Sequence, residues 1–149
     1  MLRAAQQQNQ AVAAKRSWNV VVFSVGGTKL AARTEDVGGV APWIEPVPVP
    51  SRTPFLGAML KRENEVMPVY DLAGRLQREP EGESLLCLVA RHVDGPIAIC
   101  IDSAIPSLHT VEIGQIMPSR RMDLETLGSF NNDGQDIDIV ALQRLGRTR

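Results

Sequence analysis

The chain has 149 residues, of which 44% are hydrophobic and 22% charged, and its formal net charge at pH 7 is -1. These values are near globular averages and exclude a disordered or low-complexity protein, while the length suits one domain or two small subdomains that share a core. Binding to nucleic acid is disfavoured, because it needs a basic groove with stacking aromatics and the aromatic content is only 4%.

The amino-terminal segment, residues 1–17, is rich in Ala and Gln but carries few large apolar side chains. Ala and Gln favour helix, so we expect a short helical arm with few contacts that could anchor it to the domain. Neither a membrane-spanning run nor a signal-peptide stretch before Lys15 is present in the sequence. These features predict a cytoplasmic protein that does not insert into a membrane.

Two β-hairpins are predicted in the first half of the domain. Residues 20–25 and 28–32 are apolar and flank Gly26-Gly27, which is typical of a two-residue turn. Residues 58–60 and 66–70 form a second pair around a polar tip, residues 61–64. Asp71 follows this pair and is expected to cap a short helical turn.

The second half repeats the pattern beyond a polar linker at residues 77–84, which is the predicted subdomain boundary. Residues 85–90 and 97–101 flank Asp94-Gly95, a strong hairpin signal. Residues 118–134 are polar and are predicted to be a connection. A last strand at residues 137–140 and a short closing helix at 142–145 complete the chain, which predicts an all-β barrel or sandwich.

Cysteine and histidine residues give no sign of a metal or cofactor site. Cys87 and Cys100 each lie inside an apolar run, where a thiol behaves as a small hydrophobic group. The sequence has no CxxC pair and no histidine cluster. We therefore expect no bound metal, no cofactor and a reducing compartment.

The second hairpin, from Phe55-Leu56-Gly57 to Val66-Met67-Pro68-Val69-Tyr70-Asp71-Leu72, resembles a segment of the CheW family of chemotaxis-type coupling proteins. Residues 23–32, 98–103 and 137–145 are similar to other segments of that family, and the resemblance covers about residues 18–145. It implies a CheW-like domain over 18–149, built from two small SH3-like β-barrels packed together.

The hairpin tip departs from the family pattern. The family commonly carries Asn-Leu-Arg-Gly there, whereas alignment on Pro68 and Asp71 gives Lys61-Arg62-Glu63-Asn64 in this chain. An acidic residue thus occupies the place of the family's arginine. The resemblance implies two partner-binding regions. They are the tip residues Lys61, Arg62, Glu63 and Asn64, and an apolar groove with Val37, Val40 and Trp43.

The resemblance implies a non-enzymatic adaptor that couples a CheA-type histidine kinase, through its regulatory domain, to a chemoreceptor cytoplasmic tip or a related input. The altered tip leaves open a role in another assembly, such as surface motility or pilus control. Self-association also remains open.

The sequence contains little that supports an enzymatic function. Asp102-Ser103 follows an apolar strand as in aspartic peptidases, whose mechanism needs two carboxylates that share a proton, but Ala104 stands where those enzymes have glycine. His92 and His109 have no matching Ser and Asp with which to form a triad.

Overall fold

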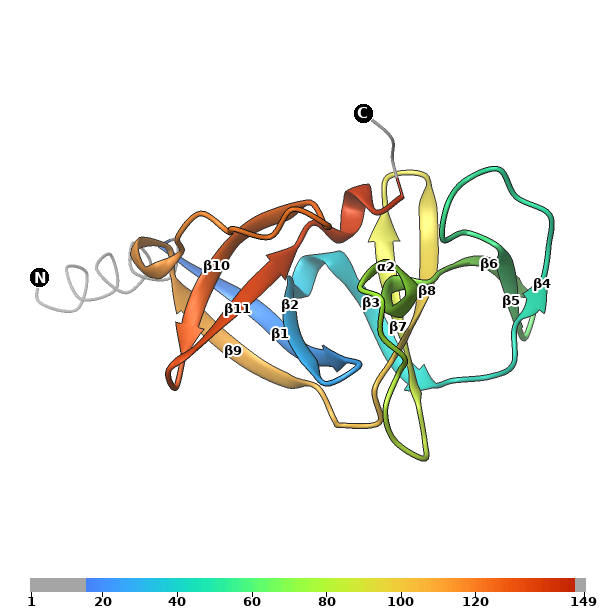
Figure 1. Cartoon of the computed structure of the whole chain (residues 1–149), viewed down its shortest axis with the longest axis horizontal. Coiled ribbons are helices and arrows are strands. Elements are labelled where there is room, and N and C mark those ends of the chain that lie inside the picture. The colour runs from blue at the N-terminus through green and yellow to red at the C-terminus, as the bar shows by residue number, and fades with distance from the viewer. Residues whose placement is uncertain (1–15, 147–149) are drawn as a thin grey trace, which may run out of the picture.

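The computed structural model describes residues 16–146 (Figure 1). The predicted helical arm lies almost wholly outside the described residues, and Ser17, its last residue, begins the first strand. No helix in the described part is long and apolar enough to cross a membrane. The elements are β1 (Ser17–Val25), β2 (Thr28–Arg33), η1 (Thr34–Asp36), β3 (Val37–Pro42), β4 (Val47–Pro48), β5 (Ala58–Arg62), β6 (Glu65–Tyr70), α2 (Leu72–Arg75), β7 (Leu86–His92), β8 (Gly95–Ile101), β9 (Ser107–Glu112), η2 (Ile113–Gln115), β10 (Thr126–Asn132), β11 (Gln135–Val140) and η3 (Leu142–Arg144).

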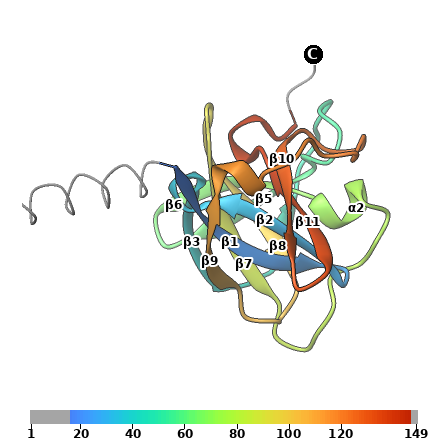
Figure 2. The same ribbon diagram turned by 90° about the vertical axis from the view of Figure 1, so that its left-hand side faces the viewer.

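These strands form two sheets that lie side by side along the long axis of the molecule (Figure 1). Figure 2 views the molecule along that axis, with sheet A in front. Sheet A has the order β10-β11-β2-β1-β9, and sheet B has the order β3-β7-β8-β6-β5-β4. An antiparallel bridge between Met117 and Ser129 joins the segment after β9 to β10, which curls sheet A toward a closed barrel. The all-β architecture predicted from the sequence is confirmed.

The predicted hairpins form, with turn chemistry that explains why. Gly26 and Gly27 have φ values of 59° and 81° between β1 and β2. A two-residue turn with both φ angles positive matches the twist of its flanking strands and favours glycine. β7 and β8 pair in register around Val93-Asp94, with His92 opposite Gly95.

The chain passes between the sheets at two places, η1 and the segment after β8. Sheet A receives β1 and β2 from the amino end and β9 to β11 from the carboxyl end, while sheet B holds the strands from β3 to β8. The polar segment 77–84, expected at the subdomain boundary, instead joins α2 to β7, and its neighbouring strands β6 and β7 belong to the same sheet. Similar hairpins in the two halves of the sequence therefore do not correspond to the two barrels.

The strand β10 lies where the sequence predicted a connection. Residues 118–134 were predicted to be a polar connection, but Thr126–Asn132 pairs with β11 across most of its length. The outer face of the strand carries Leu127, Ser129 and Asn131, and its inner face is supplied by Gly128 and Phe130, both buried. Phe130 packs into the core of sheet A with Ile137 and Ile139.

A hydrophobic core shared by the two sheets holds them together. Phe23 and Leu30 of sheet A pack in one cluster with Leu88 and Ile99 of sheet B, and each is at most 2% exposed. Sheet A has a second core on its opposite face, and sheet B has another around Leu60, Met67 and Cys87. Burial on both faces explains why the strands read as continuous rather than alternating apolar runs.

Asp102, which directly follows β8, links the two sheets through hydrogen bonds. It is 3% exposed, and its carboxylate accepts hydrogen bonds from the backbone N–H groups of Gly26 and Gly27, both at 2.8 Å. A third N–H, from Glu81 in the 77–84 segment, donates to the same carboxylate at 2.8 Å. One side chain therefore joins the β1–β2 turn, the end of β8 and the polar segment.

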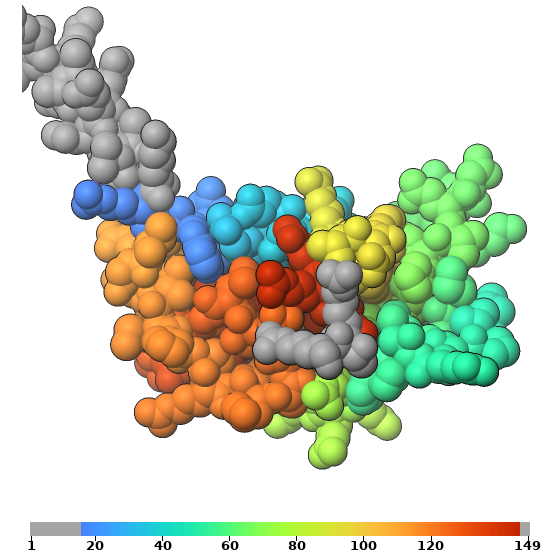
Figure 3. All heavy atoms as spheres, turned by 90° about the horizontal axis from the view of Figure 1, so that it is seen from above, coloured from blue at the N-terminus to red at the C-terminus, as the bar shows by residue number. Residues whose placement is uncertain are grey.

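The closing segment at the carboxyl end lies between the two lobes of the molecule (Figure 3). Leu142 of η3 is fully buried in the shared core. The side-chain amide of Gln143 donates to Asp36 of η1 at 2.7 Å, while its backbone oxygen accepts from Val93 N–H at 3.2 Å. The predicted short closing helix is confirmed as a 3₁₀ turn.

Candidate protein-interaction site

The tip of the β5–β6 hairpin carries four of the predicted contact residues. Lys61 and Arg62 are the last residues of β5, Glu63 and Asn64 form the turn, and all four are exposed. Arg62 is two residues from the buried Leu60 and so shares its face of the strand, while Lys61 points to the other face. Glu63 adopts a φ of 55°, which is uncommon for a residue other than glycine.

The predicted groove residues have different surroundings. They are Val37, Val40 and Trp43. Val37 packs against the core shared by the two sheets, whereas Trp43 packs against the core of sheet B around Cys87. Val40 is 42% exposed on the edge strand β3. The structure therefore does not bring the three side chains into one groove.

The hairpin tip and Trp43 lie at opposite ends of sheet B. Trp43 N–H donates to the carbonyl of Leu85, next to the start of β7. β6 runs parallel to β8 with Val69 opposite Ala98, so the tip that precedes β6 lies toward the β7–β8 turn. A partner that contacts both regions must span the length of the strands.

Trp43 lines an apolar hollow with a volume of about 650 Å³, which we call the Trp43 hollow. Phe55 and Tyr70 also line it, and Ala58 and Val69 contribute from the β5–β6 hairpin. No sequence pattern predicted this convergence, because Trp43, Phe55 and Tyr70 come from three separate segments.

Asp71 lies at the rim of the Trp43 hollow and is the N-cap of α2. Its Oδ1 accepts a hydrogen bond from Gly74 N–H at 2.9 Å, as the sequence predicted for a capping aspartate. The side chain is exposed, so its charge faces solvent and the hollow.

The edge strands of the two sheets expose further apolar side chains. Leu108 of β9 is 76% exposed and lies opposite Val21 of β1, and Ile105, just before β9, is 89% exposed. Sequence reasoning missed both, because it predicted no strand at residues 107–112. An exposed edge strand with apolar side chains is a feature of surfaces that bind other proteins.

Comparison with known proteins identifies the family. The family model of the CheW-like domain matches residues 19–148. The chain belongs to the CheW-like family. This family consists of scaffold and adaptor proteins of chemotaxis signalling, so the resemblance stated from the sequence is confirmed.

A solved structure supports the fold of this CheW-like chain. The crystal structure of the scaffolding protein TtCheW from Thermoanaerobacter tengcongensis matches with a TM-score of 0.73 and 18% sequence identity. The match covers 88% of this chain and 93% of that chain, and it shows the fold of two SH3-like subdomains. Among curated protein sequences, none matches this chain significantly.

The polar residues considered for catalysis have structural uses in this CheW-like domain. The Asp102 carboxylate is buried and accepts hydrogen bonds from three backbone N–H groups. His92 hydrogen-bonds through Nε2 to the carbonyl of Leu145 at 2.8 Å, and its Nδ1 accepts from Asp94 N–H. His109 contacts the hydroxyl of Ser107 at 2.9 Å.

Metal binding finds no support in the geometry of residues 16–146. Within this range, no group of three or more His, Cys, Asp or Glu side chains is placed to hold a metal ion. Cys87 and Cys100 face each other across β7 and β8 as free thiols. Burial is the main factor that raises the pKa of both, that of Cys100 to about 12, so both thiols are protonated at neutral pH.

Proposed function

We propose that this CheW-like protein is a cytoplasmic, non-catalytic adaptor that couples a CheA-type histidine kinase to a chemoreceptor or a related signalling input. The observation that carries the proposal is the exposure of apolar side chains on two edge strands, Val40 on β3 and Leu108 on β9, in a chain of a scaffold family. Edge strands and neighbouring apolar side chains supply affinity and specificity when one protein adds to the sheet of another.

The charged tip of the β5–β6 hairpin is the second proposed contact. Lys61, Arg62 and Glu63 are exposed on a rigid pair of strands, where binding residues often occur. Charges at the rim of an interface chiefly set the rate of association and the choice of partner. We therefore assign specificity to the tip and affinity to the exposed apolar side chains.

Calorimetric titration of the full chain with the regulatory domain of a CheA-type kinase, and separately with a chemoreceptor cytoplasmic tip, tests the proposal. We expect a one-to-one complex with at least one of them. Clean absence of binding to both at tens of micromolar would contradict it.

Two variants locate the contacts. Replacement of Lys61, Arg62 and Glu63 by alanine is expected to lower the affinity for the kinase domain or for the receptor tip about tenfold. Leu108→Asp is expected to lower the affinity for one of these two partners by as much or more. Asp133→Asn alters the exposed turn of the β10–β11 hairpin and is the matched control. Equal affinities for all variants would move the interface away from both regions.

A second candidate is an adaptor for a different assembly, such as one that controls surface motility or pili. The departure of the tip favours it, since Glu63 places a negative charge where the family commonly has arginine. Deletion of the gene would then impair surface movement and leave chemotactic swimming intact. Self-association, the remaining possibility, is measured by sedimentation of the purified chain.

A further inference from the structure

The aromatic residues of this chain are unevenly distributed, and three of them, Phe23, Tyr70 and Phe130, are buried. The sequence contains two Trp, one Tyr and three Phe residues. Three of these six, Trp43, Phe55 and Tyr70, line the Trp43 hollow. The Phe55 and Tyr70 rings lie 6.1 Å apart with an interplanar angle of 54°, so they present differently oriented faces and edges. Such a concentration of π faces in one small hollow suits a ligand that aromatic rings attract.

The charge of the hollow points to the sign of that ligand. Asp71 is the one charged side chain among the residues that line it. Burial raises the pKa of Tyr70 and that of Cys100. The nearby Arg75 charge lowers the pKa of Tyr70, and the Asp71 charge adds to the rise of both. The Asp71 charge in the lining therefore favours a positive ligand, which is the charge that the faces of aromatic rings also attract.

One cation of the chain already lies over a ring of this group. The guanidinium of Arg75, on α2, lies over the Phe55 ring at 5.7 Å from its centroid. Arg75 belongs to a neighbouring cleft and does not line the Trp43 hollow. Arg75 therefore partly offsets the Asp71 charge at the Tyr70 ring, while the residues that line the hollow supply no cation of their own.

We propose that the Trp43 hollow binds the cationic side chain of an arginine or lysine presented by a partner protein. The partly exposed Trp43 and Phe55 rings would contact the cation, and the Asp71 carboxylate at the rim would pair with it. This inference names a chemistry of recognition and does not require the partner to be a kinase or a receptor.

The strand beside the hollow explains why a side chain, rather than an added strand, is the recognised element. β4 is the outer strand of sheet B, and prolines at 46, 48 and 50 remove backbone donors from it and its flanks. Proline on an edge strand prevents the ladder of hydrogen bonds through which an added strand would bind. Insertion of a side chain into the hollow needs no such donors.

A pair of blocked pentapeptides tests the proposal, one with a central arginine and the other with citrulline, which has nearly the same shape without the charge. Trp18→Phe leaves Trp43 as the only tryptophan, so its fluorescence and its indole N–H signal in NMR spectra report on the hollow. We expect the arginine peptide to bind about tenfold more tightly than the citrulline peptide. Equal binding of the two peptides, or no perturbation of Trp43 by either, would overturn the proposal.

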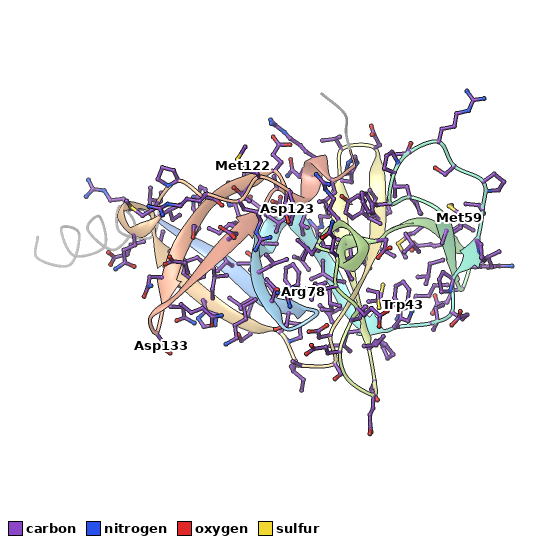
Figure 4. All side chains as sticks on the ribbon, in the orientation of Figure 1. Trp43, Met59, Arg78, Met122, Asp123 and Asp133 are labelled. Carbon is purple, nitrogen blue, oxygen red and sulfur yellow. The ribbon has the colours of Figure 1, made fainter. Side chains whose placement is uncertain are left out.

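Substitutions in the same background separate charge from folding. Asp71→Asn removes the charge and keeps a residue that caps helices equally well, so we expect preserved stability and loss of most of the arginine preference. Asp133→Asn changes the net charge equally at the far end of the molecule, as Figure 4 shows, and is expected to change nothing. A preference for arginine that survives Asp71→Asn and Phe55→Leu together would place the cation elsewhere and refute the assignment.

Discussion

Asp102 illustrates how one buried residue can organise several segments. Its carboxylate is 3% exposed and accepts three backbone N–H bonds, each at 2.8 Å, from segments far apart in the sequence. Bonds from neutral donors to a charged acceptor contribute more than neutral pairs do, and a buried donor that loses its acceptor is costly.

Asp102→Asn is therefore expected to lower the free energy of unfolding by about 2–4 kcal/mol, because its amide group places N–H donors against N–H donors. Urea denaturation followed by circular dichroism measures the change. Asp133→Asn, at an exposed turn, is the control and should alter stability by less than about 0.5 kcal/mol. A near-neutral effect of Asp102→Asn would show that the three bonds contribute little to folding.

The thiols of Cys87 and Cys100 make stability depend on alkaline pH. Burial raises the pKa of Cys100 from 9.0 to about 12 and that of Cys87 in the same direction, so the folded state holds these protons more tightly than the unfolded state does. Their contribution is complete below about pH 9 and is lost as the pH rises toward 12.

We expect the free energy of unfolding to fall between about pH 9 and pH 12, and to fall less steeply in the Cys100→Ala variant. Urea titrations at several pH values supply the comparison. Because Tyr70 also has a raised pKa, some decline should remain in the variant. Identical slopes for the two proteins would mean that the Cys100 thiol does not contribute.

At the scale of elements, Gly128 fixes the path of β10. Its φ of 143° lies at a bulge in the pairing with β11, and a Cβ there would come within 2.5 Å of Ile116 Cγ2 and 3.0 Å of the Met117 carbonyl oxygen. The adjacent Ser129 makes both backbone hydrogen bonds of the bridge to Met117, at 2.7 and 2.8 Å. Only a residue without a side chain fits between β10 and that segment.

Gly128→Ala is expected to destabilise the protein by about 2–3 kcal/mol and to speed hydrogen exchange at Ser129 N–H. Gly114→Ala provides the control, since nothing lies within 4 Å of the Cβ that it would add. An unchanged exchange rate in the Gly128 variant would contradict the close approach of the two segments.

The sequence predicted the elements that depend on interactions between neighbouring residues. It did not predict those that depend on contacts between distant segments. The hairpins at Gly26-Gly27 and Asp94-Gly95, and the Asp71 cap, depend on neighbouring residues, so local patterns revealed them. β10 was missed because only Leu127 and Phe130 are large apolar residues in it, so it resembles a loop until the strand is paired with β11. The Trp43 hollow depends on the pairing of β5, β6 and β8, which no local pattern specifies.

For the whole molecule, the shared core predicts cooperative unfolding. Phe23 of sheet A and Ile99 of sheet B belong to one buried cluster, and Leu142 lies in the same cluster. Neither sheet can lose its partner without exposing that cluster, so we expect one transition for both.

The two tryptophans test this, because Trp18 lies in sheet A and Trp43 lies at the edge of sheet B. Variants that retain one tryptophan each should give the same urea midpoint. Leu142→Ala should lower both midpoints together, with a loss of about 2–5 kcal/mol. Separate midpoints for the two reporters would show that the barrels unfold independently.

The passage of the chain from sheet A to sheet B and back has a consequence for its synthesis. A ribosome delivers β1 and β2 first, yet the strands that complete their sheet, β9 to β11, emerge last. Sheet B is continuous in the sequence and can assemble while translation proceeds. The apolar faces of β1 and β2 must wait, exposed to chaperones or to aggregation, until the final strands leave the exit tunnel.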